Sequence, residues 1–353
     1  MRLHRRLRFL IPMVAAAAVL SACSSSAEGE QATSLRLGYF PNLTHAAAVL
    51  GVADGLFDSE LEPLGATLEP TVFNAGPDAV TALFGDSIDI AYIGPNPTIN
   101  AYVESGGEAV KVIAGAASGG AALVVRDGIE SSADLVGAKL ATPQLGNTQD
   151  VALRFWLQEQ GLSADINGGG DVSILPQSNA DGLTAFTLGN IDGAWVPEPW
   201  VSEYVKAGAK VLVDETSIWP DGQFITTNIV VRSAFLEANP DLVTAFLKGH
   251  LAAINAIEAD PAAAQAVVRG AISDLTGADI DEAVFASAWG NVRYTWDPLP
   301  ATLKRSAEHA ISVGLLESAG VDAIGGVDGF DNLYDLTLLN ALLEESGEEA
   351  LAP

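Results

Sequence analysis

Three stretches of the sequence place polar residues where a strand-like run gives way to a predicted helix. In chain order the candidates are Asn42, Thr44 and His45, then Pro95 and Asn96, then Asn147, Thr148 and Gln149. A helix start leaves backbone N–H groups unpaired and carries the positive end of the helix dipole, so it can bind an anion without a lysine or arginine. Where several starts converge on one cleft, we expect them to bind a sulfonate, a nitrate or a similar oxyanion.

Each start also has a plainer explanation as a helix cap. Asn42 or Thr44 can cap the first of these helices, and Asn96 can cap the second with Pro97 as its first residue. His45 either donates a hydrogen bond to a bound oxyanion or simply caps and packs. The number of such starts, and their spread over both of the lobes predicted below, favours the binding interpretation.

Residues 192–200, DGAWVPEPW, bring two tryptophans and a carboxylate together at a strand end. Trp195 and Glu198 form either an aromatic wall with a hydrogen-bonding acid or packing between domains, and both alternatives stay open. Trp200 is expected to pack.

Small residues mark a second segment that a ligand could approach. Ser118, Gly119 and Gly120 leave the backbone accessible at the end of a strand-like run. Asn228 lies in a later strand-like run and is a further candidate contact. We therefore include these four residues among the predicted ligand-binding residues.

The sequence contains no recognisable catalytic pattern. Its four histidines, His4, His45, His250 and His309, are well separated, and HExxH, GxSxG, a Cys/His cluster and a nucleotide-phosphate loop are all absent. We expect a protein that is not an enzyme, with no catalytic residues, no metal and no cofactor.

The elements that must position these residues alternate between strands and helices. Predicted strands lie at 35–39, 67–72, 88–93, 111–115, 121–126, 139–141, 172–175, 193–196, 210–213 and 227–232. Predicted helices lie at 45–56, 77–84, 97–104, 131–136, 148–160, 179–188 and 199–206, and after residue 232 at 233–260, 261–274, 280–290, 300–318 and 331–345. This alternation is typical of an α/β protein with parallel sheets.

The length of the chain and two of its strand-like runs predict two lobes with a ligand cleft between them. Runs 121–126 and 227–232 could carry the chain from one lobe to the other and back. We predict a discontinuous lobe I, residues 34–121 with 224–350, and an inserted lobe II, residues 122–223.

The N-terminus has the features of an exported lipoprotein. Four arginines within residues 1–8 precede a short apolar run of about 14 residues, too short for the roughly 20 that span a bilayer. Residues 20–23, LSAC, end this run. We predict a signal peptide over 1–22, lipidation at Cys23, the only cysteine, and a flexible tether over 23–33.

The chain is strongly acidic. Its formal charge is −28, and loss of the four arginines of residues 1–8 would bring the mature chain to −32. Such a surface does not attract nucleic acid or an anionic membrane. An anionic ligand would have to be held by local dipoles and hydrogen bonds.

The mature chain resembles the nitrate/sulfonate/taurine branch of ABC-transporter substrate-binding proteins. The resemblance runs from residue 35 to about 345 and depends on LRLGYFPNLTHAAAVLGVADGLF, DIAYIGPNPTINAY, SGGAALVVRDGIESSADLVGAKLATP, AFTLGNIDGAWVPEPW and NIVVRSAFLEANPDLVTAFLKGH. It implies the periplasmic-binding-protein type II fold and ligand-facing loops at 42–45, 95–96, 118–120 and 147–149, together with Trp195 and Glu198.

The resemblance further implies a role and its partners. We expect an extracytoplasmic solute-binding component that closes its lobes on a small ligand and delivers it to an ABC permease with its ATPase. It would be a monomer, anchored by lipid at the outer face of the cytoplasmic membrane, or periplasmic if the cell has an outer membrane. No lysine or arginine occupies the matched positions, which weakens nitrate, and Glu198 would suit the ammonium group of an aminosulfonate. The alternatives are a carrier of a vitamin precursor such as a thiamine-type pyrimidine, with Trp195, Tyr39 and Phe40 around it, and a biosynthetic enzyme of the same fold.

Overall fold

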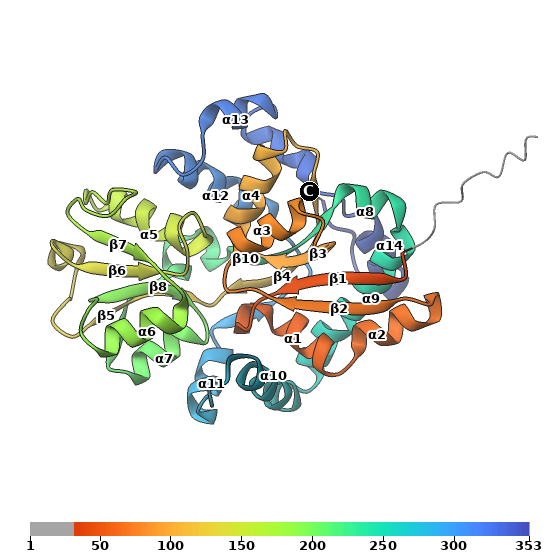
Figure 1. Cartoon of the computed structure of the whole chain (residues 1–353), viewed down its shortest axis with the longest axis horizontal. Helices are drawn as coiled ribbons and strands as arrows, with labels where there is room; N and C mark the ends of the chain where they lie inside the picture. Colours follow the sequence, from red (N-terminus) through yellow and green to blue (C-terminus); the bar gives the residue numbers. More distant parts are fainter. Residues whose placement is uncertain (1–31, 353) are drawn as a thin grey trace, which may run out of the picture. The chain divides into compact units, whose positions relative to one another are not determined.

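The computed structural model describes residues 32–352. Within them the chain forms two β-sheets, sheet A and sheet B, with helices packed on their faces (Figure 1). No helix in this range is both long and apolar enough to cross a bilayer. The predicted signal peptide and Cys23 lie outside the described residues.

Sheet A has the strand order β11-β4-β10-β3-β1-β2. Its strands are β1 (Ser34–Tyr39), β2 (Thr67–Val72), β3 (Ile90–Ile93), β4 (Val110–Gly119), β10 (Ile225–Arg232) and β11 (Val292–Tyr294). β1 runs parallel to β2 and β3, whereas β10 is antiparallel to β3 and β4. All four residues of β3 are buried, as expected of a central strand covered on both faces.

Sheet B has the order β7-β6-β8-β5-β9. Its strands are β5 (Ala121–Arg126), β6 (Lys139–Thr142), β7 (Ser173–Pro176), β8 (Gly193–Pro197) and β9 (Ala209–Asp214). β6 is parallel to β7 and β8, and β5 is antiparallel to β8 and β9. The carboxyl ends of β6, β7 and β8 therefore meet at one edge of the sheet, where loops lead into helices.

Helices cover both faces of each sheet. In sheet B, α5 (Thr148–Glu159) packs on one face, and α6 (Asn179–Thr187) and α7 (Trp200–Lys206) pack on the other (Figure 1). Around sheet A the α-helices are α1 (Ala46–Ala53), α2 (Leu56–Leu61), α3 (Gly76–Phe84), α4 (Pro95–Glu104), α8 (Ser233–Ala238), α9 (Pro240–Ala259), α10 (Pro261–Thr276), α11 (Glu282–Trp289), α12 (Pro300–Ser312), α13 (Ser318–Ala323) and α14 (Thr337–Ser346). Short 3₁₀ turns complete the set: η1 (Leu43–His45), η2 (Glu62–Leu64), η3 (Ser132–Leu135), η4 (Glu215–Ile218), η5 (Pro220–Gly222) and η6 (Val327–Leu333).

The chain passes between the sheets at places that differ from the prediction. The runs 121–126 and 227–232 do not cross, because each lies within one sheet and is hydrogen-bonded to neighbours on both sides. The first crossing is at Gly119 and Gly120, whose φ values of 75° and 70° turn the backbone between β4 and β5. The return runs through η4 and η5, where Ala121, Trp219 and Phe224 form a small apolar cluster. The lobe boundaries themselves stay a prediction.

Several predicted helices are shorter in the structure for local reasons. The helix predicted over 45–56 is divided into α1 and α2 in the structure, because Gly55 between them adopts a left-handed conformation. The helix predicted over 233–260 is interrupted at Asn239 in the structure, since Pro240 is the first residue of a new helix, α9. β11 was missed, because three residues are too few to produce a pattern in the sequence.

Candidate functional site

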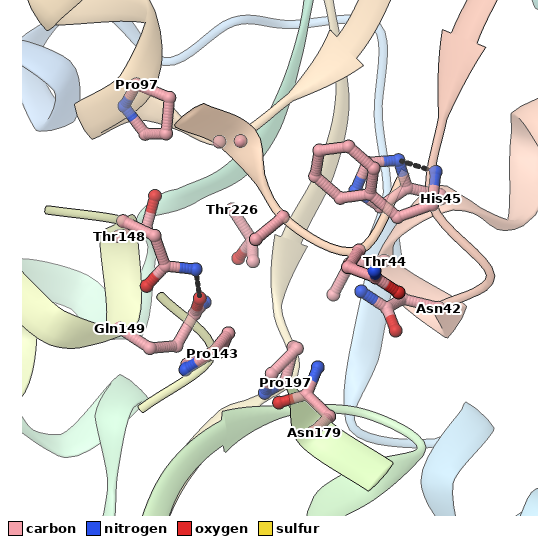
Figure 2. A pocket seen from close by; sticks show the side chains of 16 residues that line it. Asn42, Thr44, His45, Pro97, Pro143, Thr148, Gln149, Asn179, Pro197 and Thr226 are labelled. Atoms are coloured by element: carbon pink, nitrogen blue, oxygen red, sulfur yellow. Dashed lines mark hydrogen bonds between the residues drawn. The ribbon is translucent and has the colours of Figure 1, made fainter. Parts of the chain in front are cut away.

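A pocket lies where strand ends of both sheets lead into helices (Figure 2). Sheet A and its loops contribute Phe40, Asn42, Thr44, His45, Asn74, Ala75, Gly76, Gly94, Pro97 and Thr226. Sheet B and its loops contribute Pro143, Asn147, Thr148, Gln149, Asn179 and Pro197. Six of the predicted ligand-binding residues are thus brought together: Asn42, Thr44, His45, Asn147, Thr148 and Gln149.

On the sheet A side, η1 follows β1 and presents Asn42, Thr44 and His45, all buried. The backbone N–H of Phe40 donates to Nδ1 of His45 at 3.3 Å. Burial lowers the pKa of His45 to about 3, so the ring is neutral. Because Nδ1 accepts a hydrogen bond, the single ring proton is on Nε2, and His45 can act only as a donor there.

On the sheet B side, α5 begins directly after the loop that follows β6. Asn147 is its N-cap, and its Oδ1 accepts from the backbone N–H of Asp150 at 3.1 Å. The N–H groups of Thr148 and Gln149 occupy the first turn, where a helix supplies no acceptor. The Oγ1 of Thr148 is buried and has no hydrogen-bond partner among residues 32–352. A buried unpaired hydroxyl beside the N–H groups of a first helical turn is suited to bind a ligand oxygen.

Thr148 reaches across to the other sheet. A Cβ atom placed on Gly94, at the end of β3, would lie 2.4 Å from Thr148 Oγ1. Only glycine at position 94 therefore leaves room for the hydroxyl.

The start of α4 differs from the prediction. The helix begins at Pro95 with Gly94 as N-cap, so Asn96 does not cap it and Pro97 is not its first residue. Pro95 and Pro97 have no N–H to offer. The Nδ2 of Asn96 donates to the carbonyl of Ser306 at 3.1 Å, away from the pocket, and Pro95 and Asn96 are not among the lining residues.

None of the predicted residues Ser118, Gly119 and Gly120 lines the pocket, and the crossing is formed by Gly119 and Gly120. Ser118 is buried in the β4 ladder. The carbonyl of Gly119 accepts from Thr226 Oγ1 at 2.6 Å, so Gly119 contacts the site only through a lining residue. Asn228, further along β10, is completely buried, also does not line the pocket, and has neither amide atom hydrogen-bonded within the described residues.

Trp195 and Glu198 also lie outside the pocket lining. Trp195 is completely buried in the core of sheet B and donates from Nε1 to Oε2 of Glu215 at 2.7 Å. Glu198 accepts from Asn291 Nδ2 at 2.7 Å and from the Oγ and N–H of Ser202 at 3.0 and 3.1 Å. It lines a separate hollow together with Gly120 and Asn291. Packing is the interpretation that the structure favours for Trp195.

Six polar or small lining residues were not predicted, namely Asn74, Ala75, Gly76, Gly94, Asn179 and Thr226. Asn74 and Gly76 follow β2 at the start of α3, and Asn179 follows β7 at the start of α6, with Ser178 as its cap. The rule that ligands lie beyond the carboxyl ends of parallel strands could have identified these three. Thr226 lies inside β10, and no local signal distinguishes it from its neighbours.

The pocket holds donors without formal charge. Among the described residues, those that line it include no Asp, Glu, Lys or Arg, and His45 is neutral. It can therefore stabilise an anion only by hydrogen bonds and helix dipoles, and it provides no carboxylate for a cation.

Comparisons with known proteins find several binding proteins to which this chain is similar. The taurine-binding periplasmic protein of Escherichia coli is 29% identical over 246 residues, which cover 69% of this chain and 72% of that protein. The alkanesulfonate-binding protein of Xanthomonas axonopodis superposes with a TM-score of 0.68 at 21% identity, over 81% of this chain and 95% of the other. The periplasmic nitrate-binding protein of Synechocystis gives a TM-score of 0.72 at 15% identity, over 89% of each chain.

These likenesses confirm the predicted fold, since both solved structures are of solute-binding proteins and superpose over most of this chain. Residues 28–272, more than half of the chain, match the model of one family. The chain belongs to the NMT1-like family.

Proposed function

We propose that this protein is the extracytoplasmic solute-binding component of an ABC importer and that it binds a small oxyanion-bearing solute in the pocket between the two sheets. The observation that carries the proposal is the start of α5, where the unpaired Thr148 hydroxyl and two first-turn N–H groups border a pocket without charged side chains. Its relatives that bind taurine, alkanesulfonate and nitrate support the same class of ligand.

The acidic surface fits this mode of binding. With a net charge of −28 the chain repels anions at long range, but salt screens that field within about 10 Å. Selection then depends on the short-range donors of η1 and α5. An aliphatic sulfonate suits these donors because it presents only acceptor oxygens, and the remaining lining, with Phe40 and three prolines, can contact a short alkyl chain.

We further propose that the two sheets, with their helices, close on the ligand by bending at the two crossings. Two of the hydrogen bonds that join the two sheets with their loops and helices lie at Asn42 and Leu43. The Leu43 N–H donates to the carbonyl of Glu198 at 3.0 Å, and Trp200 Nε1 donates to Asn42 Oδ1 at 3.0 Å. The closed form would then dock on the permease, which works with its ATPase.

Neither alternative has a comparable observation in its favour. A pyrimidine carrier needs aromatic faces, but Trp195 lies in the core and, of the three residues named for that role, only Phe40 lines the pocket. A biosynthetic enzyme would need reactive groups, and the pocket lining offers a single neutral imidazole. The relatives compared above are named as binding proteins.

Membrane attachment is a separate part of the proposal. We propose that Cys23 is lipidated after removal of residues 1–22 and that the segment up to residue 33 tethers the protein to the outer face of the cytoplasmic membrane. Cys23→Ser should move the protein from the membrane fraction to the soluble fraction. Retention of that variant in the membrane would contradict lipid anchoring.

Ligand binding is tested by thermal unfolding of the protein with taurine, alkanesulfonates, nitrate, sulfate, bicarbonate and pyrimidine precursors. A ligand that binds only the native state stabilises it by about 2.7 kcal/mol at a hundredfold excess over its Kd. We expect stabilisation by at least one sulfonate. Stabilisation only by a pyrimidine precursor would retain the transport role and refute the oxyanion site.

A further inference from the structure

We propose that the pocket prefers oxyanion heads whose oxygens carry no hydrogen, and that Trp200 sets this preference from outside the pocket lining by fixing the amide of Asn42. The inference rests on the proposed oxyanion-binding function and narrows the expected ligands to oxyanions without a protonated oxygen. It distinguishes a sulfonate from a protonated phosphonate of the same size and charge. It also gives a role to Trp200, which the sequence predicts only to pack.

The orientation of the Asn42 amide follows from its partner. An indole N–H can only donate, so the atom that receives the hydrogen bond from Trp200 Nε1, at 3.0 Å, must be the amide oxygen of Asn42. The Nδ2 group of Asn42 then carries the hydrogens that remain for a ligand. Trp200 belongs to α7 beside sheet B, whereas Asn42 belongs to the loop that follows β1, so the contact exists only when both parts are in place.

Gln149 is oriented through a similar chain of contacts. The backbone N–H of Asp150 donates to Asn147 Oδ1, which leaves Asn147 Nδ2 as a donor. That group donates to Gln149 Oε1 at 3.1 Å, so Gln149 Nε2 is left for the ligand. His45 is also fixed as a donor, because the N–H of Phe40 donates to Nδ1 and leaves the ring proton on Nε2.

Three lining side chains, Asn42, His45 and Gln149, are therefore fixed as donors by groups behind them. A sulfonate oxygen can accept from each of them. A phosphonate monoanion brings one P–OH group, and its hydrogen would face N–H donors while the donor that it displaces stays unpaired. Leaving a buried donor unpaired weakens binding by about tenfold or more.

Several lining residues retain an acceptor and limit the preference. The Thr148 hydroxyl has no partner among residues 32–352, and its oxygen can accept as well as donate. Thr226 uses its hydroxyl hydrogen on the carbonyl of Gly119, so only its lone pairs face other groups. Asn179 has no partner for Oδ1 among residues 32–352, and its amide can turn either end to a ligand. For this reason we expect a preference of about tenfold rather than complete exclusion.

The experiment compares ethanesulfonate with ethylphosphonate, which have nearly the same shape. Binding of each to the purified chain is measured calorimetrically near pH 6, where ethylphosphonate carries one P–OH. We expect wild type to bind ethanesulfonate at least about tenfold more tightly. In Trp200→Phe the Asn42 amide is free to turn, and the ratio should fall below about threefold.

Trp219→Phe is the matched control. Like Trp200, Trp219 donates from its indole Nε1 to a side-chain oxygen, here Oε1 of the buried Glu215 at 3.3 Å, but Trp219 does not line the pocket. Trp219 lies at the return crossing, so its substitution can change closure, but closure acts on both ligands alike and the wild-type ratio of their affinities should be kept. If Trp200→Phe does not fold, Asn42→Asp provides a second test. An aspartate at this position puts an acceptor in place of the Nδ2 donor, so ethylphosphonate should then bind more tightly than ethanesulfonate.

Equal binding of the two ligands by wild type would overturn the inference and leave the proposed function standing. An unchanged ratio in folded Trp200→Phe, or in Asn42→Asp, would overturn the role of Trp200 and Asn42. If folded wild type binds no oxyanion of any kind, the proposed function fails, and this inference fails with it.

Discussion

The starts of α5 and α4 are predicted from the sequence as equivalent anion sites, but the structure makes them different. α5 is capped by an asparagine side chain, and its first turn keeps the N–H groups of Thr148 and Gln149. α4 is capped by Gly94, and prolines at its first and third positions remove two of the donors that a helix start normally offers. A helix dipole is common to both, so the two starts differ in the donors that their first-turn residues leave, and we expect this difference to decide whether each can bind an anion.

The most direct way to test this comparison is to make α5 resemble α4. Thr148→Pro removes the first N–H of α5 together with the unpaired hydroxyl. Proline is well tolerated at the first helical position, and Asn147 already has an extended backbone, with ψ of 171°. Loss of two donors to an anion should weaken sulfonate binding by about a hundredfold, roughly 3 kcal/mol, as measured by calorimetry.

The thermal midpoint of Thr148→Pro serves as its control. We expect a shift of only a few degrees, since the substitution breaks no hydrogen bond within the helix. Full binding by a folded Thr148→Pro would show that the start of α5 is not the anion site.

A smaller change separates the hydroxyl from the backbone. Thr148→Val keeps the shape and the N–H groups but removes Oγ1, which has no partner within the described residues. Sulfonate binding should weaken by about tenfold. The free energy of unfolding without ligand should not fall, because burying an unpaired hydroxyl costs free energy and valine removes that cost.

Thr148→Val is informative because affinity and stability should move independently. Urea titration of the protein with and without sulfonate measures both. A loss of stability equal to the loss of binding would instead indicate that Oγ1 has a structural partner, and the hydroxyl would no longer support a ligand site.

The opposite result is expected at α4. The Nδ2 of Asn96 donates to the Ser306 carbonyl in a buried position, so Asn96→Ala should lower the free energy of unfolding by about 1–2 kcal/mol. The affinity for sulfonate should stay within about twofold of wild type, because the amide points away from the pocket. A large loss of sulfonate affinity at unchanged stability would instead show that Asn96 contacts the ligand.

The sequence predicts the elements around the site better than the contacts within it. β2 and β5 begin and end at the predicted residues, since turn residues and glycines limit both strand-like runs. The strand-to-helix rule likewise finds Asn42, Thr44, His45 and the Asn147–Gln149 start, because it depends only on local order along the chain.

The remaining residues depend on contacts that local order cannot reveal. Alternate residues of a strand point to opposite faces, and Trp195 points to the face of sheet B that α5 covers. A tryptophan one position earlier or later in β8 would point to the opposite face. The partner of Trp200 is Asn42, 158 positions earlier in the chain. No pattern within either segment predicts that hydrogen bond, so the tryptophan that the sequence assigns to packing is the one beside the pocket.

The smallest effect on binding is expected from pH, and it tests whether the η1 side acts by charge or by hydrogen bonds. The pKa of His45 is lowered by burial to about 3, so the imidazole stays neutral at every pH above that value. Sulfonate affinity should therefore change by less than about twofold between pH 5 and pH 8. If His45 bound the anion as a cation, affinity would rise as the pH fell toward 5.

Stability should respond to pH although affinity does not. The folded pKa of His45 lies below the ordinary value of 6.5, so the unfolded chain binds the proton first as the pH falls. Its contribution to stability is complete above pH 6.5 and is lost as the pH falls toward 3, and the buried His250, with its pKa also lowered to about 3, acts in the same direction. In His45→Gln the donor to the ligand can be kept while this titration disappears, so the variant should bind sulfonate and lose less stability in acid than wild type does. A variant that binds normally but keeps the full acid dependence would assign that dependence to other groups and leave His45 only its hydrogen bond.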